Sequence, residues 1–124
     1  MRALIVDDSR FMRAYLRGML QERGMDCVEA GDGQEGLKQL HAGPRFDLAF
    51  MDRNMPVMNG LEMLQELRTA EDAQLRAIMA TPEGEKENIV RALSAGAVDY
   101  LMKSFDREAL GEKRRCLGWR RSRA

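Results

Sequence analysis

Five polar residues of this chain share one feature, since each stands where a short apolar run ends. They are Asp7, Asp8, Asp52, Thr81 and Lys103. Three carboxylates held close together repel one another, and a divalent cation removes that conflict. Mg²⁺ prefers oxygen ligands and leaves coordination positions open for phosphate oxygens. If the fold gathers these residues, they indicate a magnesium site that handles a phosphoryl group.

The nucleophile of such a site must be a carboxylate, because the five residues include no serine, cysteine or histidine. Its covalent product is an aspartyl phosphate. Lysine and threonine suit this chemistry, since phosphoryl transfer depends mainly on positioning and charge neutralisation. Asp52 is the candidate nucleophile. The alternative is that Asp7 and Asp8 only cap a strand end, and for that pair alone the two interpretations are equally good. Convergence with the other three residues favours the metal site.

The apolar runs that precede these residues are typical of buried strands. The five predicted strands are residues 3–6, 25–30, 47–51, 75–80 and 97–102. Segments with apolar residues at helical spacing alternate with them. The predicted helices begin near Ser9, Asp32, Asn59, Glu85 and Asp106. Because Arg114 falls where the apolar stripe of the last helix should continue, we expect that helix to be short.

This alternation predicts an α/β fold with a doubly wound, five-stranded parallel sheet and five helices on both faces. The length of 124 residues suits one domain spanning residues 1–124. In such folds ligands bind at the carboxyl ends of the strands. We therefore expect one edge of the sheet to collect all five polar residues.

Composition narrows the range of partners. The chain carries 20 basic and 20 acidic side chains, so no overall charge favours nucleic acid or a membrane surface. The basic C-terminal tail is interpreted as a solvated terminus, and binding to nucleic acid or an acidic partner is the alternative. Its basic residues are Arg114, Arg115, Arg120, Arg121 and Arg123. Cys27 and Cys116 are too few for a disulfide framework and suggest free thiols in a reducing compartment. With no membrane-length apolar run and no signal peptide pattern, we expect a cytoplasmic protein.

Four fragments occur at the strand ends in a fixed order. They are "VDDS" at 6–9, "MDRNMPVMNG" at 51–60, "ATPEGEKENI" at 80–89 and "DYLMKSF" at 99–105. With these fragments the chain resembles, over nearly its whole length, a response-regulator receiver domain of the single-domain chemotaxis type. The resemblance implies a flavodoxin-like sheet with strand order 2-1-3-4-5. It also implies a phosphorylation-activated switch of a two-component system, with no enzymatic activity beyond self-directed phosphoryl transfer and autodephosphorylation.

The resemblance further implies how the phosphoryl site is built. Asp52 would accept the phosphoryl group from a phosphohistidine on a sensor histidine kinase. Asp8, Asp52 and the backbone carbonyl of Asn54 would bind Mg²⁺ or Mn²⁺, and Asp7 would act through water. Asn54 and Glu83 match positions that tune dephosphorylation.

A switch is implied by three other residues. Lys103 would contact the phosphoryl group, and Thr81 would move to hydrogen-bond it. Tyr100 would swing inward when the threonine moves, although ordinary packing of a buried tyrosine is the alternative. These changes would alter the face of the fourth helix, fifth strand and fifth helix that binds a downstream effector protein.

Two site positions depart from the family pattern. Pro82 follows Thr81, where receivers usually have a backbone N–H that donates to the phosphoryl group, and proline has none. Ser104 follows Lys103, where receivers usually have a proline across a cis bond. A non-proline cis bond costs roughly 2.5 to 4 kcal/mol, so we expect a trans bond and a shifted loop here.

Two other functions compete with the switch. A pseudo-receiver would bind partners without being phosphorylated, and Pro82 and Ser104 make this credible. A magnesium-dependent hydrolase with an aspartyl intermediate, of the haloacid dehalogenase type, is the weaker alternative. Such hydrolases usually carry a second aspartate two residues after the nucleophile, where this chain has Asn54, and its length leaves no room for a cap domain.

Overall fold

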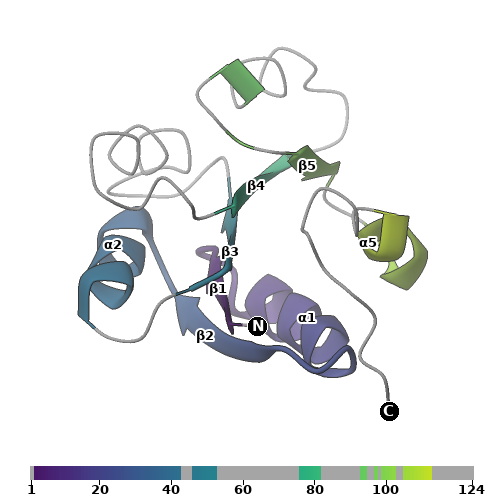
Figure 1. Cartoon of the computed structure of the whole chain (residues 1–124), viewed down its shortest axis with the longest axis horizontal. Coiled ribbons are helices and arrows are strands. Elements are labelled where there is room, and N and C mark those ends of the chain that lie inside the picture. The colour runs from purple at the N-terminus through teal and green to yellow at the C-terminus, as the bar shows by residue number, and fades with distance from the viewer. Residues whose placement is uncertain are drawn as a thin grey trace.

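The structure is a computed structural model, and it describes part of the chain. The described residues are 2–42, 46–52, 76–81, 93–94, 97, 99–102 and 105–112. They contain five strands and three helices, arranged as a sheet with helices on either side (Figure 1).

The five strands form one parallel sheet in the order β2-β1-β3-β4-β5. Their bounds are β1 Arg2–Val6, β2 Asp26–Ala30, β3 Leu48–Asp52, β4 Arg76–Thr81 and β5 Asp99–Met102. All five predicted strands are confirmed, with ends that differ by one or two residues. The strand order implied by the resemblance is confirmed as well.

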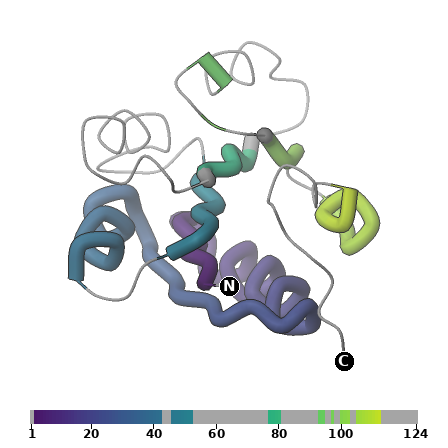
Figure 2. Tube along the Cα trace, in the orientation of Figure 1, coloured from purple at the N-terminus to yellow at the C-terminus, as the bar shows by residue number. Residues whose placement is uncertain are grey.

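The described helices cover both faces of the sheet, as a doubly wound fold requires. They are α1 Arg10–Gln21, α2 Gly33–Ala42 and α5 Arg107–Glu112. In Figures 1 and 2, α1 and α5 lie on one side of the strands and α2 lies on the other. Of the predicted third and fourth helices, the description includes only Leu93 and Ser94, both helical. The rest of those two helices, and the part of the final helix after Glu112, lie outside the described residues.

Alternation along the strands divides the core into two layers. Ile5, Phe50 and Ile78 point to one face, where they pack with Leu20 of α1 and Leu110 of α5. The residues between them along the strands point to the other face, toward α2. Those residues include Leu4, Val6, Ala49, Met51 and Met79. Because side chains fill both faces, the polar residues that follow the strands are left at the sheet's edge.

Side-chain caps start the described helices at the predicted positions. The Ser9 hydroxyl accepts from the backbone N–H of Met12 at 3.2 Å, and Asp106 Oδ1 accepts from that of Ala109 at 2.9 Å. Asp32 caps α2 by accepting from the N–H of Glu35 at 2.8 Å. In a capping box the residue at Glu35 would accept in return from the N–H of Asp32, but here the Glu35 carboxylate accepts from Gly31 N–H at 3.1 Å, one residue earlier.

The end of α1 shows why the chain needs a glycine there. Gly24 has a φ of 83°, a left-handed conformation that residues with a Cβ rarely adopt. Its N–H donates to the carbonyl of Gln21 at 3.0 Å, and the chain then turns into β2. Gly24 thus marks the point where the chain leaves α1.

Two further findings bear on the sequence predictions. Phe11 shares the helical spacing of the apolar residues of α1 but is 78% exposed, so the face of α1 that packs on the core is narrower than the spacing alone indicates. Cys27 is a buried free thiol, and burial raises its pKa above the usual value. Among the described helices, none has the length and apolar character needed to cross a membrane.

Candidate functional site: an acidic cluster at the carboxyl ends of β1 and β3

The pairing of β1 with β3 brings three carboxylates together. Val6 pairs with Met51 in the parallel register, so the residues that follow, Asp7 and Asp52, lie side by side at the carboxyl ends of the two strands. Together with Asp8 they form a group in which one oxygen from each carboxylate lies within 4.8 Å of the others. The sequence predicted this convergence, and the structure brings these three residues together.

The three carboxylates differ in their exposure to solvent. Asp7 and Asp52 are buried, with 4% and 2% of their surfaces exposed, while Asp8 is exposed. Removing charged groups from water is unfavourable unless opposite charge or hydrogen bonds compensate. Repulsion between like charges also strengthens as the surroundings become less polar. A nearby positive charge would therefore stabilise the two buried carboxylates, Asp7 and Asp52, while the third, Asp8, faces the solvent.

Local hydrogen bonds fix the position of Asp7. Its Oδ1 accepts from the backbone N–H of Ser9 at 2.8 Å, and its own N–H donates to the carbonyl of Ala30 at 3.1 Å. Its carbonyl accepts from Arg13 Nη1 at 2.7 Å. Three hydrogen bonds thus hold Asp7 in the turn from β1 into α1, and the one from Ser9 fixes its carboxylate.

The donor set suits a hard divalent cation. All three side chains offer carboxylate oxygens, and no sulfur or imidazole ligand belongs to the group found among the described residues. Mg²⁺ binds through one or two carboxylates together with water and phosphate oxygens, and it demands small, hard ligands. Because Asp8 is exposed, water can complete the coordination shell. The residues therefore fit a magnesium ion.

Two other predicted site positions, Thr81 and Tyr100, lie on the neighbouring strands β4 and β5 of the same sheet. Asp52 pairs with Ala80, so Thr81, the last residue of β4, stands one position further toward the same edge of the sheet. Tyr100, on β5, is half-buried and pairs with Met79. Lys103 directly follows the last residue of β5.

Several predicted positions fall outside the description. They are Asn54, Pro82, Glu83, Lys103 and Ser104, together with the side chain of Thr81. The predicted trans bond between Lys103 and Ser104 stays a prediction for the same reason.

A comparison with known protein families follows from this fold. The family model for the response regulator receiver domain matches residues 3–115 of the chain. The chain belongs to this receiver family. Receiver domains of this kind are signalling switches rather than conventional enzymes, and they bind Mg²⁺ at an acidic pocket.

Individual receivers show how closely the chain follows the family. It is 37% identical to the chemotaxis protein CheY of Pseudomonas aeruginosa over 115 residues, which cover 91% of this chain and 92% of that protein. Identity to CheY1 of Helicobacter pylori is 36%, with 91% and 93% covered. The solved structure of the chemotaxis response regulator CheY4 of Vibrio cholerae matches with a TM-score of 0.85 at 32% identity, covering 94% of this chain and 97% of that one.

Sequence reasoning missed an ion-pair network that supports the receiver's acidic cluster. Arg13 Nε lies 3.1 Å from Glu29 Oε1, and Arg17 Nη1 lies 2.8 Å from Glu29 Oε2. The hydrogen bond from Arg17, aided by one from Arg13, lowers the pKa of Glu29 below its usual value. Arg13 therefore links β2 to the carbonyl of Asp7. The four-residue spacing of the arginines on one helix face was the only available signal.

Proposed function

We propose that the chain is a phosphorylation-controlled switch in which Asp52 is the phosphoacceptor. The observation that carries the proposal is the buried carboxylate of Asp52 within the cluster formed with Asp7 and Asp8. In the reaction, an Asp52 oxygen forms a bond to phosphorus as the bond from phosphorus to a histidine nitrogen of a sensor kinase breaks. The histidine nitrogen leaves with the electron pair.

The acidic cluster supplies the charge environment for this transfer. Asp8, Asp52 and the backbone carbonyl of Asn54 would ligate Mg²⁺ or Mn²⁺, and Asp7 would hold a coordinated water. The cation neutralises the charge of the incoming phosphoryl oxygens. Asp7 is held by Ser9, Ala30 and Arg13, so its carboxylate needs no rearrangement to take this part.

The readout of the switch is assigned to the neighbouring strands. Thr81 and Lys103, at or just beyond the ends of β4 and β5, would bind the phosphoryl oxygens, and Tyr100 would move inward in response. The affected face, formed by the fourth helix, β5 and α5, would bind a downstream effector protein. Residues 1–124 would form one receiver domain in the cytoplasm, and the domain would catalyse only its own phosphorylation and dephosphorylation. Asn54 and Glu83 would set the rate of dephosphorylation.

A pseudo-receiver is the second candidate, and one sequence feature favours it. Pro82 offers no N–H at a position from which receivers usually donate to the phosphoryl group. A hydrogen bond to a charged group contributes about 1.5 to 3 kcal/mol, so its loss shortens the life of the phosphorylated state unless water replaces it. Pro82→Ala should then slow the decay of the phosphorylated protein, and unchanged rates of phosphorylation and decay would remove this argument.

One experiment separates the two candidates. The chain and its Asp52→Asn variant are incubated with Mg²⁺ and a small-molecule phosphodonor, and intact masses are measured over time. The switch predicts that the wild type gains the mass of one phosphoryl group and that the variant gains none. Absence of an Asp52-dependent gain in the wild type would favour the pseudo-receiver.

A further inference from the structure

The junction between β5 and α5, residues 103–106, carries Lys103 and is tied to α1 by a long-range hydrogen bond. The Tyr15 hydroxyl donates to the backbone carbonyl of Phe105 at 3.0 Å, between residues 90 positions apart in the chain. The rings of the same two residues are in contact, with centroids 5.9 Å apart. Phe105 itself is 6% exposed and belongs to the core layer beside α1. The carbonyl is thus held by both a polar and an apolar contact.

Contacts further along hold the start of α5 against the other end of α1. Arg107 pairs with Glu22 through two hydrogen bonds of 2.9 and 2.7 Å, and Arg23 donates to the carbonyl of Arg107 at 3.0 Å. These groups are exposed, and exposed ion pairs contribute little individually. The bond from Tyr15 is partly buried, and its acceptor, the carbonyl of Phe105, is two residues after Lys103 in the sequence.

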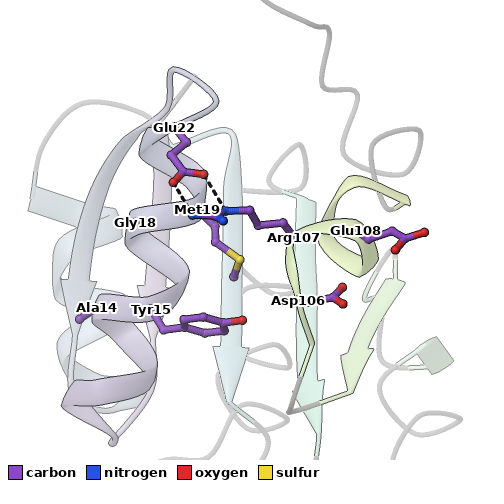
Figure 3. Close-up of a pocket in the computed structure, with 8 residues that line it drawn as sticks. All are labelled: Ala14, Tyr15, Gly18, Met19, Glu22, Asp106, Arg107 and Glu108. Carbon is purple, nitrogen blue, oxygen red and sulfur yellow. Dashed lines mark hydrogen bonds and ion pairs between the residues drawn. The ribbon is translucent and has the colours of Figure 1, made fainter.

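Tyr15, Glu22 and Arg107 line a pocket of about 520 Å³ between α1 and α5 (Figure 3). In the figure the Tyr15 ring extends from α1 toward α5, and Glu22 and Arg107 meet across the gap. The polar groups of the pocket act within the protein, because Glu22 and Arg107 bind each other and Asp106 caps α5. These polar contacts therefore hold Phe105 and the start of α5 against α1 and the residues that follow it.

We infer that Tyr15 is a positioning residue for Lys103. The hydroxyl fixes the carbonyl of Phe105, two residues after Lys103, relative to α1. The N-terminal end of α1 directly follows Asp8 and Ser9. One helix is thus connected both to the turn that holds Asp7 and Asp8 and to the carbonyl of Phe105. Ser104 makes this contact important, because serine leaves φ free where proline would fix it. The inference rests on the proposed role of Lys103 in phosphoryl transfer.

The test is a double-mutant cycle of Tyr15→Phe and Lys103→Ala. Tyr15→Phe removes only the hydroxyl and keeps the ring contact with Phe105. Phosphorylation by a small-molecule phosphodonor with Mg²⁺ should slow about three- to tenfold, the factor that corresponds to one hydrogen bond. In the Lys103→Ala background the same change should alter the rate less than about twofold, because the group being positioned is gone.

Two readouts distinguish positioning from a general loss of structure. The Mg²⁺ affinity of Tyr15→Phe, measured by titration calorimetry, should equal that of the wild type, because the hydroxyl that is removed bonds to the carbonyl of Phe105 and not to a carboxylate of the cluster. The matched control is Arg23→Gln, which also removes a side-chain bond to a backbone carbonyl, that of Arg107 at the start of α5. This control should phosphorylate at the wild-type rate.

Each outcome bears on the inference. Equal slowing by Tyr15→Phe in both backgrounds, a parallel loss of Mg²⁺ affinity, or an equal defect in Arg23→Gln would overturn it. A wild type that is phosphorylated at Asp52 while Tyr15→Phe reacts at the same rate would refute the positioning role alone. A wild type that gains no phosphoryl group would refute the proposed function and this role with it.

Discussion

The acidic end of β1 and β3 and the junction between β5 and α5 are held by different kinds of contact. Asp7 and Asp52 are placed by neighbouring strands whose backbones pair in register, and Asp7 is further held by nearby Ser9. The junction and the first residue of α5 are held by side chains from α1 and from the two residues after it, across 84 to 90 positions of sequence. Backbone pairing is shared among many residues, whereas each junction contact depends on one side chain. We therefore expect the acidic end to be the more rigid of the two regions.

The largest expected difference concerns the apolar residues beneath the two regions. Leu4 of β1 and Leu110 of α5 are both fully buried. Leu4→Ala should lower the free energy of unfolding by about 3 to 5 kcal/mol, because strands on both sides prevent the cavity from closing. Leu110→Ala should lower it by about 2 to 3 kcal/mol, since a short helix at the edge can shift into the space. Urea denaturation measures both values.

An exposed residue serves as the control for this pair. Gln21→Ala, at the end of α1, should change the free energy of unfolding by no more than about 0.5 kcal/mol. If Leu110→Ala destabilises the protein as much as Leu4→Ala does, the junction is as rigid as the sheet and the comparison between the two regions is wrong.

A smaller effect is expected from the charge of the acidic cluster. Asp8→Asn relieves repulsion with Asp7 and Asp52, so without Mg²⁺ the free energy of unfolding should rise by on the order of 1 kcal/mol. The same variant should gain less stability than the wild type when Mg²⁺ is added, because it binds the ion more weakly. Urea denaturation with and without Mg²⁺ gives both quantities.

The control for Asp8→Asn removes an exposed negative charge elsewhere. Asp26→Asn, at the start of β2, should leave the stabilisation by Mg²⁺ unchanged. Equal responses of the two variants to Mg²⁺ would show that net charge, and not the cluster, governs the effect.

The smallest expected effect concerns the ion-pair network behind Asp7. The pKa of Glu29 is lower in the folded chain than in the unfolded one, so its contribution to stability is fully present above the unfolded-state pKa of about 4.3. The contribution is lost as the pH falls through the lower, folded-state pKa. Glu29→Gln should reduce the free energy of unfolding by about 0.5 to 1 kcal/mol at pH 7.

The pH dependence provides the decisive comparison for Glu29. Denaturation of wild type and Glu29→Gln at pH 7 and again at an acidic pH, below the folded-state pKa, should show the difference shrinking toward zero. A difference that stays constant over this range would mean that the ionised carboxylate is not what stabilises the link between β2 and α1.

The same contrast explains which features could be predicted from the sequence. Strand runs, cap residues such as Ser9 and Asp106, and polar residues at strand ends follow from local patterns. Because parallel strands end at one edge, those patterns were sufficient to predict that Asp7, Asp8 and Asp52 meet.

Features that depend on packing between distant elements could not be predicted in this way. The exposure of Phe11 and the bond from Tyr15 to Phe105 are examples. Phe11 fits the helical apolar pattern, but the packed face of α1 is narrower than that pattern. The partner of Tyr15 depends on how closely α5 approaches α1, which no local pattern records.

The central claim is that the acidic cluster makes Asp52 a phosphoacceptor, and locating the phosphoryl group tests it most directly. The chain is treated with a small-molecule phosphodonor, with Mg²⁺ or with excess chelator, and the modified residue is identified by peptide fragmentation mass spectrometry. We predict a single phosphoryl group on Asp52 that forms only with Mg²⁺. A group on Asp7 or Asp8, a group formed equally well with chelator, or no modification at all would contradict the account.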